Sequence, residues 1–337
     1  MLLSLFCGAG GLDLGFEQAG FEVGLAFDKN SSSLGSYRHN RQGFSSAYVR
    51  DVRDISPGML DELNGGPFHP SGVIGGPPCQ SFSDAVQEVA DDDPRHELPM
   101  IYAQLLAALN ARSPVPFFVM ENVPGLWKAR HANRYLQITD LFAKAGFNLF
   151  SAKLNACDYS TPQNRDRIFL VGLNVRMFPF AKWDSPLPTT VDRSLTTVRS
   201  AIGDLPEPTF FARGLTPDLI GEHPNHWCMR PRSWRFNTKG ALVPGESKFR
   251  SFKTLSWDQP SYTVAFGHRE VHVHPNCSRR LSVYEAMRLQ GFPAEYELTG
   301  TLSSQFTQIS EAVPPPMAKA VAESIRELVT NSQRAGC

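Results

Sequence analysis

Cys79 stands in a segment that could present a nucleophile. Gly75-Gly76-Pro77-Pro78-Cys79 follows the apolar run 72–74, and its two prolines restrict the backbone that leads to the thiol. A thiol with an unperturbed pKa of about 8.5 is a few per cent thiolate at neutral pH, which is enough for covalent catalysis. The alternative is an unreactive buried cysteine, the usual fate of a cysteine among apolar neighbours.

Three charged side chains could share a site with this cysteine. Glu121 follows the apolar run 117–120, and Arg165 and Arg167 precede the run 168–171. Taken singly, the carboxylate would be structural and the arginines would be surface charges. Because strands of a doubly wound sheet present catalytic groups at one edge, however, we expect a carboxylate and fixed hydrogen-bond donors near the thiol.

The elements that must position these groups alternate up to about residue 174. Apolar runs that predict buried strands lie at 2–6, 23–27, 72–74, 117–120 and 168–171. Stretches with helical spacing lie at 12–19, 98–111 and 135–145. The alternation predicts an α/β fold with a doubly wound, mixed but mostly parallel sheet and helices on both faces.

The composition changes near residue 175. Proline, arginine, tryptophan and histidine become frequent in 175–275, and helical periodicity gives way to short extended pieces and turns. Helical spacing returns at 282–290 and 314–329. We therefore predict a catalytic and cofactor-binding domain over 1–174, a smaller irregular domain over 175–275, and a C-terminal segment over 276–337 that completes the first.

A glycine-rich turn follows the first predicted strand. In Phe6-Cys7-Gly8-Ala9-Gly10-Gly11-Leu12, small residues allow backbone amides to approach a nucleotide-like ligand. The dinucleotide fingerprint fails because its third glycine would fall on Asp13, which disfavours a nicotinamide cofactor. Asp28 and Asp51 end the next two predicted strands and could accept hydrogen bonds from ribose hydroxyls. The alternatives are a tight turn and aspartates that cap helices.

Overall composition limits the class of protein. Among 337 residues, 42% are hydrophobic, and 33 basic residues balance 33 acidic ones. The core can therefore be large, and net charge neither requires nor excludes a polyanionic partner. Six cysteines without a CxxC pair argue against a disulfide framework and favour a reducing cytoplasm. The opening MLLSLFCGAGG predicts neither a signal peptide nor a membrane span.

Basic and aromatic residues concentrate between Met229 and Lys253. Seven basic residues stand there against one acid, Glu246, with four aromatic residues interleaved. Arginine can read guanine edges or hold phosphate, so this stretch is a candidate nucleic-acid surface; a solvated basic face is the alternative. The neighbouring histidines and cysteines lack paired ligand spacing, so we expect no metal. They are His223, His226, Cys228, His268, His272, His274 and Cys277.

Six motifs resemble, in order and spacing, those of the DNA cytosine-5 methyltransferase family. They are Phe-x-Gly-x-Gly in the glycine-rich turn, Gly-Pro-Pro-Cys-Gln at 76–80, Glu-Asn-Val at 121–123, Gln-x-Arg-x-Arg at 163–167, the segment 280–293, and Ala-Val-Pro at 312–314. The resemblance covers nearly the whole chain outside the central segment.

The resemblance implies methyl transfer from S-adenosylmethionine to carbon 5 of cytosine in double-stranded DNA. Cys79 would add to carbon 6 of a cytosine flipped out of the duplex, and Glu121 would contact ring nitrogen 3 and the exocyclic amine. Arg165 would help to orient the base. Arg167 would do the same or anchor its strand.

The resemblance also implies which residues bind the cofactor and the DNA. The expected cofactor contacts are Phe6, Gly8, Ala9, Gly10, Gly11, Leu12, Asp28, Lys29, Asp51, Val52, Pro78, Leu98, Ala312 and Val313. The family places its variable target-recognition region in the central segment, and a loop over 80–97 should close on DNA. The expected DNA contacts are Gln80, Ser83, Arg230, Arg232, Arg235, Lys239, Arg250 and Lys253.

Two positions depart from the family pattern. The last motif carries Ser310-Glu311 where the family usually has Gly-Asn, and that asparagine lies near the cofactor. A carboxylate at 311 could repel the methionine carboxylate of the cofactor. Ser4 replaces an acidic residue that is common in the opening motif.

Two other functions stay open. An RNA cytosine-5 methyltransferase has the same fold and motif order, but the basic central segment favours duplex DNA. A catalytically silent DNA-binding homologue is opposed by the intact Cys79, Glu121 and Arg165. We expect one protomer on DNA, in the cytoplasm of a bacterium or encoded by a phage, with a cognate restriction endonuclease as genetic partner.

Overall fold

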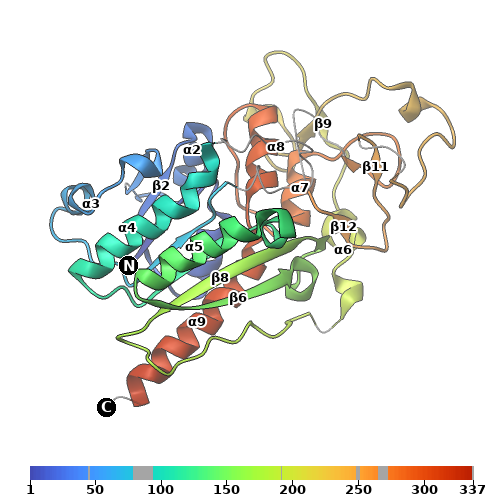
Figure 1. Cartoon of the computed structure of the whole chain (residues 1–337). Coiled ribbons are helices and arrows are strands. Elements are labelled where there is room, and N and C mark those ends of the chain that lie inside the picture. Colours follow the sequence, from blue (N-terminus) through green and yellow to red (C-terminus); the bar gives the residue numbers. More distant parts are fainter. Residues whose placement is uncertain (45, 79–93, 191, 248–250, 265–271, 336–337) are drawn as a thin grey trace.

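A seven-stranded sheet forms the centre of the molecule (Figure 1). The computed structural model describes residues 1–44, 46–78, 94–190, 192–247, 251–264 and 272–335. The strand order is β3-β2-β1-β4-β5-β8-β6, and β8 runs antiparallel to the others. The strands are β1 (Leu2–Leu5), β2 (Val23–Asp28), β3 (Ala47–Val49), β4 (Gly72–Gly75), β5 (Phe117–Asn122), β6 (Phe147–Asn155) and β8 (Asp166–Asn174).

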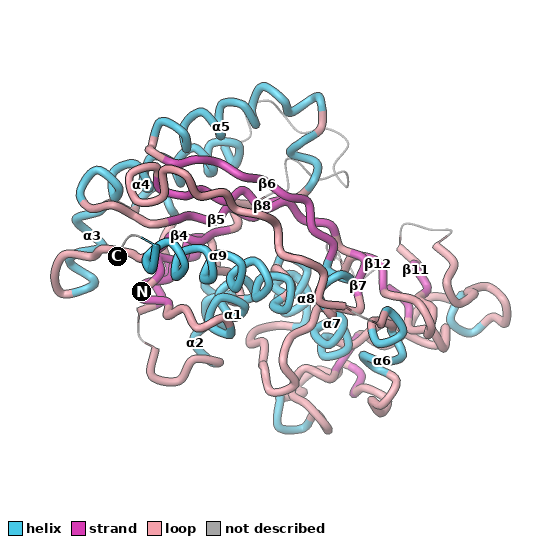
Figure 2. Tube along the Cα trace, turned by 90° about the horizontal axis from the view of Figure 1, so that it is seen from below, coloured by secondary structure: helices cyan, strands magenta, loops and turns pink. Residues whose placement is uncertain are grey.

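Helices cover both faces of this sheet (Figure 2). One face packs against α3 (Pro57–Asn64), α4 (Leu98–Arg112) and α5 (Ala132–Lys144), through buried residues such as Leu60, Leu106 and Phe142. The other face packs against α1 (Gly11–Gln18) and α9 (Pro315–Ala335). The prediction of a doubly wound, mostly parallel α/β fold is confirmed.

The described residues of the central segment form only short elements. The longest is α6 (Val198–Ile202), and the strands pair two residues at a time: β9 (Thr209–Phe210) with β10 (Trp227–Cys228), β11 (Lys253–Thr254) with β13 (His272–Val273), and β12 (Ser261–Tyr262) with β7 (Gln163–Asn164). This segment shares a hydrophobic core with α7 (Val283–Leu289) and α8 (Leu302–Glu311). The helices that follow the central segment therefore pack against it.

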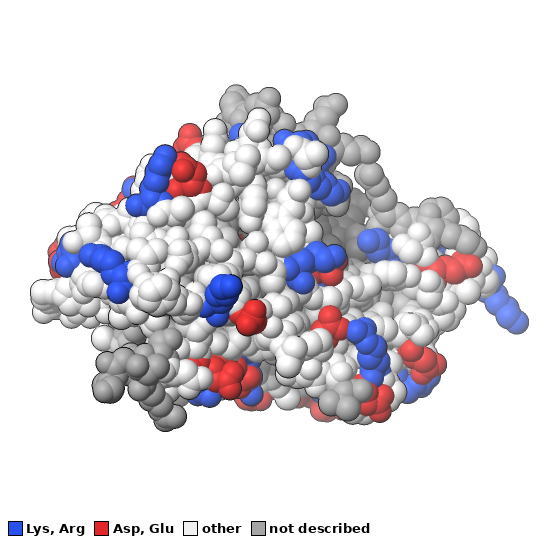
Figure 3. Space-filling model, turned by 60° about the horizontal axis from the view of Figure 1, so that its bottom comes forward, with Lys and Arg blue, Asp and Glu red and all other residues white. Residues whose placement is uncertain are grey.

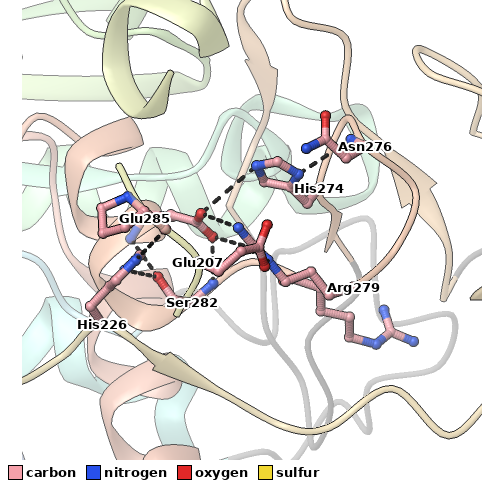
Figure 4. Close-up of polar contacts among 9 residues, drawn as sticks. Glu207, His226, His274, Asn276, Arg279, Ser282 and Glu285 are labelled. Atoms are coloured by element: carbon pink, nitrogen blue, oxygen red, sulfur yellow. Dashed lines mark hydrogen bonds and ion pairs between the residues drawn. The ribbon is translucent and has the colours of Figure 1, made fainter. Parts of the chain in front are cut away.

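A buried polar network fastens the central segment to the start of α7 (Figure 4). Arg279 is 2% exposed and donates to both carboxylate oxygens of Glu285, at 2.9 Å each, and to the exposed Glu207 at 2.7 Å. Nδ1 of His226 lies 2.9 Å from Oγ of Ser282, the residue that caps α7. A buried charge is stable only when paired, so these contacts fix the segments around 207, 226 and 279 relative to one helix.

Among the described residues, no helix is long and apolar enough to cross a membrane.

Candidate active site

A cavity of about 320 Å³ lies at the carboxyl ends of β1, β2, β4 and β5. Ligands of doubly wound sheets bind at this edge. All predicted cofactor residues except Gly10 line the cavity: Phe6, Gly8, Ala9, Gly11, Leu12, Asp28, Lys29, Asp51, Val52, Pro78, Leu98, Ala312 and Val313. Glu121 and Arg167 line the same cavity. The structure thus brings the predicted cofactor residues and part of the predicted catalytic set to one place.

The glycine-rich turn uses backbone angles that favour glycine. Gly8 has φ of 54° and Gly10 has φ of 85°, and Gly10 is the N-cap of α1. The turn is held to the end of β2 because the amide of Gly8 donates to Oδ2 of Asp28 at 2.9 Å. Gly10 therefore shapes the turn, although it does not line the cavity.

Asp28 is fixed by amides on both sides. Its second oxygen accepts from the amide of Asn30 at 2.7 Å. Burial raises the pKa of the Asp28 carboxyl, and the amides of Asn30 and Gly8 oppose that rise. A carboxylate oxygen has more than one lone pair, so Asp28 can still accept from ligand hydroxyls. Asp51, by contrast, caps the short helix η1 (Val52–Asp54) as well as lining the cavity.

A buried carboxylate lies beneath the turn. Asp13 of α1 accepts hydrogen bonds from Oγ of Ser4 and from the hydroxyl of Tyr37, both at 2.8 Å. Burial raises the pKa of Asp13 to about 6, while Arg41 lowers it. Ser4, which departs from the family pattern in the opening motif, therefore donates a hydrogen bond to an acidic residue of α1.

Glu121 and Arg167 form an ion pair in the cavity wall. Nε of Arg167 lies 2.8 Å from Oε1 of Glu121, and both side chains are about nine-tenths buried. Burial raises the pKa of Glu121, and the charges of Arg167 and then Arg165 lower it. A side chain on Gly76 would press against Oε2 of Glu121, at 3.0 Å from the added carbon. Glycine at 76 therefore leaves room for this carboxylate.

Arg165 is 1% exposed and is directed toward backbone carbonyls. Its guanidinium donates to the carbonyl oxygens of Val264 at 3.1 Å, Ser310 at 2.8 Å and Ala312 at 3.0 Å. Arg165 is absent from the cavity lining. The arginine nearer to Glu121 is Arg167, and Arg165 holds the central and C-terminal segments against the sheet.

The C-terminal segment closes one side of the cavity. Glu311, the departure in the last motif, lines it together with Gln308 and Ser310. Gln308 accepts from Oγ of Ser36 at 2.6 Å, and Tyr296 donates its hydroxyl to the carbonyl of Ala9. Residues that flank the last motif are thus tied to the glycine-rich turn and to α2 (Ser31–His39).

The predicted nucleophile Cys79 and the predicted DNA contacts Gln80, Ser83 and Arg250 lie outside the described residues. Among the described residues, Cys7 is a cysteine in the cavity wall. Burial, followed by the charges of Asp13 and Asp28, raises the pKa of its thiol well above the usual value. Cys7 is therefore held as a thiol and is a poor nucleophile.

The remaining predicted DNA contacts lie in the central segment, where several stack on aromatic rings. Arg230, Arg232 and Lys239 are exposed, and Arg235 and Lys253 are half-buried. The guanidinium of Arg235 lies 5.0 Å from the ring centre of Trp234 and 5.1 Å from that of Phe252. Elsewhere basic and acidic side chains are interspersed, as on the face in Figure 3. The described residues contain no group of three or more potential ligands that could hold a metal ion.

Some residues of the cavity were not predicted from sequence: Asn30, Ser33, Arg50, Ile55, Arg95 and Gln308. Arg50 directly follows β3, and Asn30 comes two positions after the end of β2. Because ligands bind at the carboxyl ends of the strands, their positions in the sequence could have predicted both residues. Gln308 lies on α8, and only the folded chain brings it to the cavity and to Ser36 of α2.

Comparison with known proteins decides the family. The model of the C-5 cytosine-specific DNA methylase family matches residues 1–327. The chain belongs to this family. This chain is 32% identical to the type II methyltransferase M.MthTI of Methanothermobacter thermautotrophicus, over 97% of each chain. It is 30% identical to the type II methyltransferase M.FnuDI of Fusobacterium nucleatum, over 99% of this chain and 96% of the relative.

Solved structures agree with this C-5 methylase in fold. A crystal structure described as a candidate DNA modification methyltransferase from an E. coli prophage matches with a TM-score of 0.78 and 24% identity, over 98% of this chain and 99% of the other. The Dnmt2 methyltransferase of S. pombe matches with a TM-score of 0.62 and 16% identity, over 98% of each chain. The protein is thus a DNA cytosine-5 methyltransferase with the fold of S-adenosylmethionine-dependent methyltransferases.

Proposed function

We propose that this methyltransferase modifies cytosine within a short DNA sequence, with Cys79 as nucleophile and S-adenosylmethionine as methyl donor. The observation that carries the proposal is a single cavity that contains both the glycine-rich turn and the Glu121–Arg167 pair. Pro78, which directly precedes Cys79, lines the same cavity. A cofactor on the turn and a base against Glu121 would therefore meet beside the segment that carries the thiol.

The cavity has the chemistry that S-adenosylmethionine requires. Val52, Leu98 and Phe27 offer apolar surface for an adenine ring, and Asp28 offers a fixed carboxylate for ribose hydroxyls. The turn residues Gly8 and Gly11 have no side chains, so backbone can approach the ligand closely. S-adenosylmethionine, when bound, supplies the electrophilic methyl group that carbon 5 takes up.

The protein side chains prepare the cytosine for this transfer. The Cys79 thiolate forms a bond to carbon 6, and the electron pair of the 5,6 double bond moves to carbon 5. Glu121 holds ring nitrogen 3 and the exocyclic amine. Burial raises its pKa, so this carboxyl takes up a proton more readily than a solvated glutamate and, once protonated, can donate to nitrogen 3 as negative charge develops there. Arg167 positions the Glu121 carboxyl, and Arg165 keeps the surrounding backbone in place.

Elimination then restores the pyrimidine. A water molecule takes the proton from carbon 5, the electron pair reforms the double bond between carbons 5 and 6, and the bond to sulfur breaks. Nitrogen 3 gives the proton that it received back to Glu121. The thiolate of Cys79 is returned. The pocket must exclude bulk water until methyl transfer is complete, since otherwise carbon 5 would be protonated instead.

The central segment is proposed to recognise the DNA. Its exposed basic residues and its stacked pairs, such as Arg235 on Trp234, can contact phosphates and base edges. We retain the division into a domain over 1–174, a target-recognition domain over 175–275 and a completing segment over 276–337. We also propose one protomer on DNA and a cytoplasmic location. A cognate endonuclease is proposed as well, in keeping with relatives that are named type II methyltransferases.

Bisulfite sequencing tests the proposal directly. Plasmid DNA from a host without cytosine methylation is compared after expression of the wild type and of Cys79→Ser. We expect protected cytosines in one short motif with the wild type and none with the variant. Soluble wild type that protects no plasmid cytosine would contradict the proposal; radiolabel transfer to transfer RNA would then indicate the RNA enzyme, and DNA binding without any labelling would indicate a silent homologue.

A further inference from the structure

A second basic surface follows β5, far in sequence from the central segment. Residues 122–139 contain Lys128, Arg130, His131 and Arg134 and no aspartate or glutamate. We call these four residues the basic ridge. It begins seven positions after Glu121, so it lies at the same edge of the sheet as the cavity.

The ridge rests on a rigid base. Leu126 of η4 (Pro124–Trp127) and Ile138 of α5 are fully buried in the hydrophobic core between the sheet and α4 and α5. The rings of Trp127 and Tyr135 meet edge to face with centres 6.3 Å apart. The backbone that carries the ridge is therefore anchored in the core, while the side chains of Lys128 and Arg130 are exposed.

Positive charge on the ridge is dense enough to act on its own histidine. Nε of Arg130 lies 3.0 Å from Nε2 of His131. Partial burial, followed by the charge of Arg130, lowers the pKa of His131. Further lowering comes from Arg134, His96 and Lys128. Like charges gathered at one surface attract a polyanion strongly.

The ridge and the central segment lie at the same end of the sheet. In Figure 2 the start of α5 lies above the sheet at its right-hand end, and β11 and β12 lie beyond that end, with α6 below them. The cavity with Glu121 opens at this edge. A duplex whose target base enters the cavity would thus have positive protein surface on both sides.

We propose that the basic ridge binds phosphates of the DNA duplex beside the target nucleotide, opposite the central segment. This inference rests on the proposed action on duplex DNA. Phosphate contacts position the duplex and carry no sequence information, so the ridge contributes to affinity for all DNA and leaves the recognised motif unchanged.

The test compares two triple variants of the full-length protein. Lys128→Ala/Arg130→Ala/Arg134→Ala removes three charges from the ridge. Lys144→Ala/Lys182→Ala/Arg326→Ala removes three exposed charges from the far end of α5, from the segment after β8 and from α9. Binding to a fluorescent duplex is measured by anisotropy over a range of salt concentrations, and S-adenosylmethionine binding by calorimetry reports on folding.

We expect the ridge variant to bind duplex at least about ten-fold more weakly at ~0.1 M salt, with the slope of log affinity against log salt reduced by about 0.9 per lost contact. The control variant should bind like the wild type, and both variants should bind cofactor. The proposed role of the ridge would be overturned if the ridge variant bound DNA as tightly as the wild type does, or if DNA binding were weakened equally in both variants. Wild type that binds cofactor but no duplex would instead refute the proposed function, and the ridge with it.

Discussion

Gly15 of α1 lies directly against Ala318 of α9. A β-carbon added to Gly15 would overlap the β-carbon of Ala318 and lie 2.7 Å from the carbonyl oxygen of Pro315. Since α1 begins at the glycine-rich turn, this close approach sets the position of the turn. We predict that Gly15→Ala lowers the free energy of unfolding by roughly 1–3 kcal/mol, as overpacking does, in denaturant titrations.

Gly58 provides a matched control for that substitution. It also lies in a helix, α3, and a β-carbon there would meet nothing within 4 Å. Gly58→Ala should therefore stabilise the protein by roughly 0.4–1 kcal/mol, because it restricts the unfolded chain. If both variants shifted stability in the same direction, the contact between α1 and α9 would not explain the first.

Arg279 should be more important to stability than its exposed partner. Arg279→Met leaves Glu285 buried without its cation and should cost roughly 3–5 kcal/mol, as breaking buried pairs does. Glu207→Gln changes a partner whose side chain is 65% exposed and should cost less than about 1 kcal/mol. Equal losses in thermal or chemical unfolding would show that Arg279 is not effectively buried.

Asp13 should make stability depend on pH. Its pKa of about 6 in the folded protein exceeds the value of 3.8 for an unperturbed aspartate, so the folded state holds this proton more tightly. The resulting stabilisation is complete below pH ~4 and is lost as pH rises through about 6. Relative to Asp13→Asn, the wild type should lose up to ~3 kcal/mol across this range. A constant difference between the two proteins from pH 4.5 to 7.5 would contradict the raised pKa.

Glu121→Gln should separate chemistry from cofactor binding. The amide keeps the size of the side chain but cannot supply a proton to ring nitrogen 3, so we expect kcat to fall by roughly 10²–10⁴. Affinity for S-adenosylmethionine, measured by calorimetry, should stay within about two-fold, because the turn and Asp28 are untouched. Full methylation activity in the variant would remove Glu121 from the chemistry.

Glu311→Asn tests the departure in the last motif. Glu311 lines the cavity, and two like charges ~4 Å apart in a water-like medium repel by about 1 kcal/mol. If the cofactor's carboxylate approaches position 311, the variant should bind S-adenosylmethionine about five-fold more tightly. Unchanged affinity in calorimetry would show that Glu311 does not face that group.

Sequence patterns predicted the strands and helices of the sheet's interior well. β4 and β5 are continuous apolar runs, and both were expected because strands buried on two faces read that way. β6 was not predicted, because this edge strand mixes polar and apolar residues in FNLFSAKLN. α8 was also missed, although Leu302, Phe306 and Ile309 recur at helical spacing behind the cap Thr301.

Sequence patterns could not predict which side chains would lie next to Glu121. Arg165 and Arg167 are two positions apart, and spacing alone cannot tell which one faces Glu121. The break between β7 and β8 falls at Arg165 and directs it toward carbonyls of distant segments. Likewise, nothing local links Gln308 to Ser36, 272 positions away. Contacts of this kind depend on the packed tertiary structure.

The hydroxyl of Tyr296 bonds the carbonyl of Ala9 across 287 positions of sequence. During synthesis on the ribosome, the glycine-rich turn emerges long before the residues that close the cavity over it. A nascent chain that holds only β1 to β8 has the turn and Glu121 but lacks the wall formed by residues 308–313. If this cavity is the active site, methylation must wait until translation has passed this segment, and a prematurely terminated product would carry Glu121 and Arg167 without a complete cavity.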